Sequence, residues 1–146
     1  MNLVFYNILI AIVGLAMSPF ITALIERYSK EEKIFTKDFM KDVRFDGKVA
    51  LFVPLAFIGI LFYYGLGFHF VFYSFIAVIL IISFFVDLKA QIIPNETNFI
   101  GFLVGILLAY YYLTQDFNMG INRLLGMVAG GGIFLLIALF SYLVYL

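Results

Sequence analysis

Long apolar runs separated by short polar segments dominate the chain. The hydrocarbon core of a bilayer is about 30 Å thick, and roughly 20 mostly apolar residues cross it as a helix. Five runs have or approach this length: Leu3–Ile25, Val49–Leu66, Phe68–Val86, Phe99–Leu113 and Ile121–Leu146. The fourth is short unless its helix also includes Thr97 and Asn98. The pattern predicts an all-α fold, a polytopic transmembrane bundle of about five helices that forms a single membrane domain over residues 1–146.

The largest polar segment, residues 26–48, connects the first two runs. It carries seven of the nine basic residues, namely Arg27, Lys30, Lys33, Lys37, Lys41, Arg44 and Lys48. Because connections rich in lysine and arginine remain in the cytoplasm, we expect residues 26–48 to be cytoplasmic and the amino terminus to be outside. Counting spans then places the turn Asp87–Glu96 in the cytoplasm as well. The expected location is the cell membrane (plasma or inner), crossed several times.

Two interpretations of this connection remain open. Phe35, Phe39 and Val43 recur at i, i+4 and i+8, a spacing that suits a short amphipathic helix on the membrane surface. A solvated loop with incidental apolar residues explains the same pattern equally well.

Composition supports a membrane protein and excludes several functions. Hydrophobic residues make up 65% of the chain and charged residues 12%, whereas soluble domains are about half apolar and about a quarter charged. The formal net charge is zero, so no overall field attracts nucleic acid. The chain has no cysteine and a single histidine, His69. Disulfides, thiol chemistry and a His- or Cys-rich metal site are therefore not expected, and we expect no cofactor and no bound metal.

Asp87 is the strongest candidate for a functional residue. It stands where the third apolar run meets a short polar turn, and a carboxylate in or near lipid is costly enough to indicate function. Pro94 fits the first turn of the next helix, and Glu96 would lie near the positive end of that helix. We therefore expect Asp87 at a helix–turn–helix corner on the cytoplasmic side. The alternative is a carboxylate that is hydrated at the interface or paired with Lys89.

Hydrolysis of a peptide by carboxylates normally needs two of them, one ionised to activate water and one protonated to donate to the carbonyl oxygen. No second acidic residue is an obvious partner for Asp87. Glu96 faces the same compartment, but a carboxylate at the start of a helix more often serves the helix dipole. Asp116 is predicted on the opposite side of the membrane.

Glycines and aromatic residues carry packing signals. Gly101 with Gly105, and Gly126 with Gly130, form Gly-x-x-x-Gly pairs, which predict close packing of helices in lipid. Aromatic residues near the predicted outer boundaries suit an interfacial belt: Tyr63, Tyr64 and Tyr110–Tyr112.

The string that begins at Asp87 resembles a motif of the type IV prepilin peptidases and the related archaeal preflagellin peptidases. These integral-membrane aspartic proteases carry an aspartate followed, after a short mixed stretch, by Ile-Pro-Asp or Ile-Pro-Asn. Here Asp87 is followed by Ile93-Pro94-Asn95 with similar spacing, flanking apolarity and predicted side of the membrane.

Two weaker similarities occur in the order found in the family. Residues 14–27 resemble the family's first helix, where Phe20 and Arg27 match and two positions depart, Pro19 and Thr22. Gly126–Gly132, followed by an aliphatic run, resembles the glycine-rich helix that precedes the family's second catalytic motif. The resemblance therefore covers most of the chain.

This resemblance implies an activity and a site. It implies a membrane-embedded aspartic endopeptidase that cleaves the leader peptide of type IV prepilin- or pseudopilin-like precursors at the cytoplasmic membrane face. Asp87 would be a catalytic residue, with no cofactor and no metal. The implied partners are the precursor, with its basic leader and hydrophobic helix, and the lipid bilayer, but no nucleic acid.

Two departures limit what the resemblance implies. The family's second catalytic aspartate lies in a Gly-x-Gly-Asp motif that these 146 residues lack, so we expect an amino-terminal portion of a longer peptidase that is inactive by itself. The Cys-x-x-Cys pairs of many bacterial members are also missing, which leaves methyltransferase activity unsupported. The alternative function is a non-catalytic membrane assembly or subunit protein, or a truncated inactive relative, in which Asp87 is only interfacial.

Overall fold

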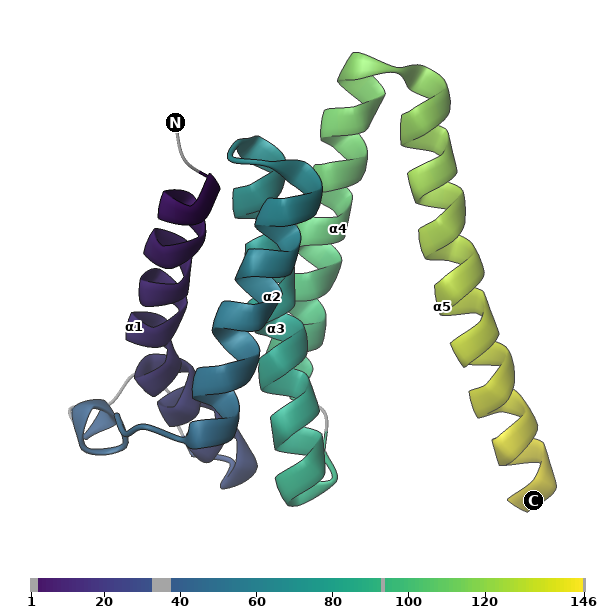
Figure 1. Ribbon diagram of the computed structural model, residues 1–146. Helices are drawn as coiled ribbons and strands as arrows, with labels where there is room; N and C mark the ends of the chain where they lie inside the picture. The colour runs from purple at the N-terminus through teal and green to yellow at the C-terminus, as the bar shows by residue number, and fades with distance from the viewer. Residues whose placement is uncertain (1–2, 33–37, 93, 146) are drawn as a thin grey trace. The chain divides into compact units, whose positions relative to one another are not determined.

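The computed structural model describes residues 3–32, 38–92 and 94–145. The described chain contains five α-helices and one short 3-10 helix (Figure 1): α1 (Leu3–Ser29), η1 (Phe39–Lys41), α2 (Gly47–Tyr64), α3 (Phe68–Ala90), α4 (Asn95–Gln115) and α5 (Phe117–Tyr145). No strand occurs among the described residues, and the predicted all-α fold is confirmed. Over the same residues, four helices, α1 to α4, are long and apolar enough to cross a membrane.

Two observed helices extend beyond the predicted apolar runs. α1 continues to Ser29 rather than ending at Ile25, and α3 continues to Ala90 rather than ending at Val86. Hydropathy indicates where a helix leaves the membrane, whereas backbone hydrogen bonds decide where the helix ends. The expectation that the third helix ends near Asp87 is therefore wrong by about one turn, because Asp87 is still helical.

Between the end of α1 and the start of α2, the described residues of the first connection contain little regular structure. Phe39 lies in η1, and Val43 lies in an irregular stretch before α2. Phe35 falls outside the described residues. Residues 38–46 therefore agree with the second interpretation, a loop, which here contains one short 3-10 helix.

The chain divides into two compact units, Met1–Phe99 and Ile100–Leu146. In the first unit, α1, α2 and α3 pack around one apolar core. α1 and α2 approach closely at Gly14, where an added Cβ would lie 2.8 Å from the Cα of Pro54. A residue without a side chain lets two helix backbones touch, which is a common way for helices to associate in lipid. The buried core residues are Ile10, Ile21, Ile25, Val49, Val53, Phe57, Leu61, Phe70, Ile82, Phe85 and Val86.

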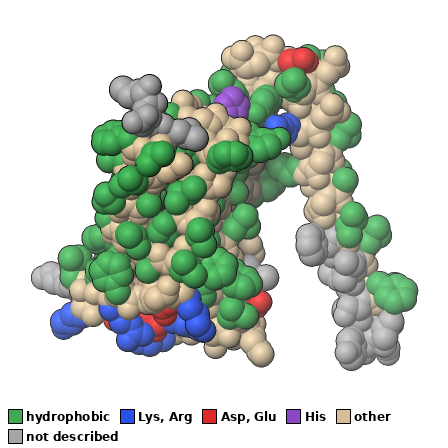
Figure 2. Space-filling model, in the orientation of Figure 1, with side chains coloured by type: hydrophobic (Ala, Val, Ile, Leu, Met, Phe, Trp, Pro, Cys, Tyr) green, Lys and Arg blue, Asp and Glu red, His purple; other side chains and the backbone are tan. Residues whose placement is uncertain are grey.

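The first unit has a charged end and an aromatic end. At the charged end α1 and α3 finish and α2 begins, and Figure 2 shows basic and acidic side chains gathered there beyond the apolar surface of the helices. At the aromatic end, next to the α2–α3 turn, Tyr64 stacks on Tyr73 with 4.4 Å between ring centroids and also stacks on His69. The connection 26–48 and the end of α3 thus share one end of the unit, as the order of the spans predicts.

In the second unit, a tight turn at Asp116 joins α4 to α5. An added Cβ on Gly120 would lie 2.7 Å from the Cα of Leu113, so this turn is too close for a larger residue to enter unchanged. The guanidinium carbon of Arg123 lies 4.3 Å from the centroid of the Tyr112 ring. Glycine and a cation–π contact therefore help to hold the two helices of this unit together.

Close approach through glycine occurs at other positions than the sequence predicted. An added Cβ on Gly101, Gly126 or Gly130 would meet no heavy atom within 4 Å, and one on Gly105 would meet only the sulfur of Met127, at 3.7 Å. The Gly-x-x-x-Gly pairs are therefore not used for backbone contact within their own unit, whereas Gly14 and Gly120 are.

Candidate functional site

Asp87 lies in the last turn of α3 with its side chain exposed. Its backbone carbonyl accepts a hydrogen bond of 2.8 Å from the N–H of Gln91, which closes the helix. Its carboxylate has no hydrogen bond or ion pair with any described residue. The carboxyl end of a helix carries a partial negative charge, so a carboxylate in the last turn is unfavourable there. Helix stability therefore does not explain this residue.

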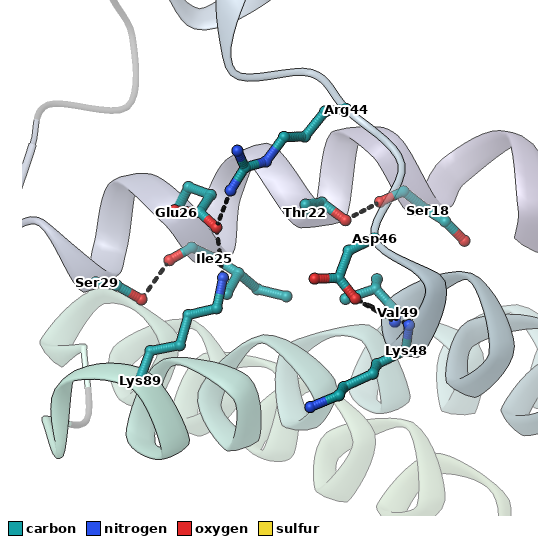
Figure 3. Close-up of polar contacts among 10 residues, drawn as sticks. All are labelled: Ser18, Thr22, Ile25, Glu26, Ser29, Arg44, Asp46, Lys48, Val49 and Lys89. Carbon is teal, nitrogen blue, oxygen red and sulfur yellow. Dashed lines mark hydrogen bonds and ion pairs between the residues drawn. The ribbon is translucent and has the colours of Figure 1, made fainter.

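Lys89 does not neutralise Asp87, although it lies only two positions further along α3. The Lys89 Nζ instead donates to Oε1 of Glu26 on α1 (Figure 3). Residues two apart on a helix do not face each other. Lys89 is thus directed to α1, and Asp87 projects from a different side of the same turn.

A short link turns the chain from α3 into α4 beside Asp87. Gln91 ends α3 in the left-handed conformation, with φ 55° and ψ 33°. The hydroxyl of Thr97, which is only 4% exposed, accepts a hydrogen bond of 3.1 Å from Ser83 and donates one of 2.8 Å to the carbonyl of Pro94. Because Ser83 lies one turn before Asp87 on the same face of α3, these bonds attach that face to the start of α4.

The predicted helix–turn–helix corner is present, with a small change in where its second helix starts. Pro94 is buried and immediately precedes α4 rather than occupying its first turn, and its carbonyl accepts the N–H of Asn98 at 3.3 Å. Glu96 lies in the first turn of α4, as expected from the favourable interaction of a carboxylate with the positive end of a helix.

Glu26 lies at the centre of an ion-pair cluster at the charged end of the first unit (Figure 3). Its Oε1 accepts from the Lys89 ammonium of α3 and, at 2.7 Å, from Nη2 of Arg44 in the first connection. The Glu26 side chain is 14% exposed, so this carboxylate is largely removed from water and has two cations as partners. One carboxylate therefore joins the end of α1 to the end of α3 and to the connection.

Arg27, the neighbour of Glu26, attaches the same connection to α1. Its Nε donates to Oδ2 of Asp42 at 2.7 Å, and its guanidinium lies 5.5 Å from the centroid of the Phe39 ring. The Arg27 side chain is 4% exposed. Sequence reasoning used Arg27 for membrane orientation and for the family resemblance, but it found neither this pair nor that of Glu26. No pattern in the sequence identifies these partners, because both pairs depend on how α1 packs.

Other carboxylates of the chain have structural roles. Asp46 accepts the N–H of Lys48 at 2.9 Å and caps α2, and Asp116 accepts the N–H of Asn118 at 2.8 Å and caps α5. Of the nine acidic side chains, five hold a hydrogen bond or ion pair with another residue that the structure describes: Glu26, Asp38, Asp42, Asp46 and Asp116. Asp87 is not one of them, so its carboxylate is available for chemistry.

The available chemistry is that of a single exposed carboxylate. Such a group can take a proton from water or, once protonated, give a proton to a carbonyl oxygen. Within the described part of the chain no second carboxyl group hydrogen-bonds to Asp87, and no three His, Cys, Asp or Glu side chains are grouped so that they could hold a metal ion. The arrangement thus presents a single exposed carboxylate at the end of α3.

Comparison with known proteins identifies a family for the segment that contains this corner. The sequence model of the type IV leader peptidase family matches residues 74–145, which contain Asp87, the α3–α4 corner and the glycine-rich segment 126–132. No curated protein and no solved structure matches the chain. The similarity of residues 14–27 to the family's first helix lies outside the matched segment and stays a prediction. The predicted family is confirmed by this match, and the chain, with its apolar helices and its exposed carboxylate at the end of α3, belongs to the type IV leader peptidase family of proteases.

Proposed function

We propose that this protein is a membrane-embedded aspartic endopeptidase that removes the leader peptide of type IV prepilin-like precursors, with Asp87 as one of its two catalytic carboxylates. The observation that carries the proposal is the family match across the corner where Asp87 stands exposed and without a partner among the described residues. The site lies at the charged end of the first unit, which we propose faces the cytoplasm because basic connections remain on that side.

The reaction needs two carboxyl groups in different protonation states. The ionised one takes a proton from water as the water oxygen attacks the scissile carbonyl carbon, while the protonated one donates to the carbonyl oxygen. The carbon–nitrogen bond then breaks as the carboxyl group that took the proton from water passes it to the leaving nitrogen, and the other carboxylate takes back a hydroxyl proton from the intermediate as its carbonyl re-forms. Asp87 supplies one of these groups, and a second carboxylate must approach it in the working enzyme.

The substrate class follows from the two environments that meet at Asp87. Large apolar side chains are exposed along the helices of the first unit, among them Leu80 and Phe84, which precede Asp87 on α3. In a membrane these surfaces suit an apolar helix in the substrate, and the polar end suits a leader peptide held outside the hydrocarbon. A precursor with a basic leader followed by a hydrophobic helix has both parts in this order.

The decisive experiment is the substitution Asp87→Asn in the full-length protein, tested on a prepilin-like precursor in membranes. The side chain keeps its size and loses its ionisable group, so the rate of leader removal should fall by at least about 100-fold. Asp46→Asn is the matched control, since asparagine caps a helix as well as aspartate does and the residue lies at the same end of the unit.

The opposite result would favour the alternative function. If Asp87→Asn processes the precursor at the rate of the unchanged protein, Asp87 is only interfacial and the chain acts as a non-catalytic membrane component. Equal losses in Asp87→Asn and Asp46→Asn would also reject the proposal, because they would show that any change of charge at this end is harmful.

A further inference from the structure

The last two turns of α3 are attached on two sides to neighbouring helices. On one side Lys89 binds Glu26 of α1, and on the other side Ser83 binds Thr97 of α4. Asp87 lies between these two attachment points along the helix and has no partner of its own among the described residues. The direction of its carboxylate therefore depends on how firmly the turn around it is held.

The turn needs such attachment because it is the end of a helix. Terminal turns open easily, since their last carbonyl groups lack partners within the helix. Here the helix ends at Gln91, whose N–H binds the carbonyl of Asp87 itself. If the end of α3 opens, the backbone of Asp87 is among the first parts of the helix to move.

Glu26 is suited to hold this turn. Its side chain is 14% exposed, and the oxygen that accepts from Lys89 also lies 2.7 Å from Nη2 of Arg44, whose own side chain is 66% exposed (Figure 3). A carboxylate that is largely withdrawn from water is screened less than a surface pair. Lys89 is 36% exposed, so this ion pair is only partly withdrawn from water, and salt screens it less than a fully exposed pair.

We propose that Glu26, acting through Lys89, is a positioning residue that fixes the last turn of α3 and with it the direction of the Asp87 carboxylate. This inference rests on the proposed function, because it assigns Glu26 a part in the same reaction. Catalytic groups must be held within a fraction of an ångström of their working geometry, and misplacement by about 1 Å can cost roughly 100-fold in rate.

The activity test compares two substitutions that remove one cation each from the same oxygen of Glu26. Lys89→Gln releases the end of α3 and should lower kcat roughly 10- to 100-fold with little change in KM. Arg44→Gln removes the other cation, which belongs to the connection and forms no hydrogen bond or ion pair with the described residues of α3, and should leave kcat within about twofold. Lys89→Arg keeps a cation at the end of α3 and should restore most of the activity.

A second measurement reads the position without using catalysis. The chain has no cysteine, so Asp87→Cys provides one attachment point for a nitroxide spin label. Lys89→Gln, added to this labelled protein, should make the electron paramagnetic resonance spectrum of the label more mobile, and Arg44→Gln should not. Glu26→Gln should act like Lys89→Gln, which covers the case in which one variant fails to fold.

The outcomes separate this inference from the proposed function. If the label is equally mobile in Lys89→Gln and in Arg44→Gln, Glu26 does not position the turn, whatever Asp87→Asn does to processing. Processing that survives Asp87→Asn rejects the catalytic role of Asp87, and with it the role of Glu26 in the reaction, while the spin label still reports whether the turn is held. Increased mobility together with the loss of kcat in Lys89→Gln supports both proposals.

Discussion

The two corners that join α3 to α4 and α4 to α5 both contain an aspartate, yet the two residues differ in almost every physical respect. Asp116 stands just before α5 and accepts the N–H groups of Asn118 at 2.8 Å and Met119 at 3.4 Å. Asp87 stands in the last turn of α3, where its carboxylate has no partner among the described residues.

The difference comes from the side of the turn on which each aspartate lies. The start of a helix offers free N–H groups and a partial positive charge, so a carboxylate there is stabilised twice. The end of a helix offers only carbonyl oxygens and a partial negative charge, which favour neither ionisation nor hydrogen bonding to a carboxylate. Asp116 is therefore explained by folding, whereas Asp87 needs a different explanation, and the catalytic role proposed above would provide one.

The sharpest structural test of this contrast is Gly120→Ala in the α4–α5 corner. The added Cβ would lie 2.4 Å from Cγ and 2.7 Å from Cα of Leu113, so the two helices must move apart. We expect a loss of about 1–3 kcal/mol in the free energy of unfolding, measured by thermal unfolding in detergent. Gly126→Ala in the same helix is the control, because its Cβ would meet nothing within 4 Å; an equal loss in both variants would disprove the tight turn.

A smaller effect is expected from Asp116→Ala. Loss of the cap leaves the first N–H groups of α5 without the carboxylate and should lower the free energy of unfolding by about 1 kcal/mol. Asp116→Asn should retain nearly all of the stability, and both variants should process a precursor at the normal rate per folded molecule. A large loss of processing in Asp116→Asn would remove the distinction between the two corners.

The smallest effect concerns the α3–α4 corner. Gln91 has φ 55°, a left-handed conformation that glycine adopts without the cost of a Cβ. Gln91→Gly should therefore raise the free energy of unfolding by about 0.5 kcal/mol, as seen in the midpoint of thermal unfolding. Gln91→Ala keeps the Cβ and should not stabilise; if it stabilises as much as glycine does, the left-handed end of α3 is not formed.

The helices of this protein were predicted well from the sequence, because a bilayer restricts what a chain inside it can form. Each predicted apolar run corresponds to a helix, because a chain in hydrocarbon must satisfy its backbone hydrogen bonds internally. The errors lie at helix ends, such as the extension of α1 to Ser29 and of α3 to Ala90. Hydropathy carries no information about the few polar residues that continue or begin a helix beyond the apolar run.

The candidate site was predicted only in part. Asp87 and its corner are recognisable in the sequence because a carboxylate at the end of an apolar run is rare. Glu26 and Lys89 are not recognisable as partners, since 63 positions separate them along the chain. Other charged residues lie at least as near to each of them in the sequence. The close contact at Gly14 was missed for the same reason, because no Gly-x-x-x-Gly pattern marks it and its partner, Pro54, lies on another helix.

The amino-acid sequence by itself therefore determined that this is a helical membrane protein, that its family is that of the type IV leader peptidases, and that Asp87 is its most unusual carboxylate. Run length and local motif suffice for these conclusions, because both are properties of neighbouring residues. Only the tertiary structure decided which carboxylates are engaged, that Lys89 pairs with Glu26, and that Asp87 is left without a partner among the described residues. Charge partners are chosen by packing, which brings together the ends of helices that are far apart in the chain.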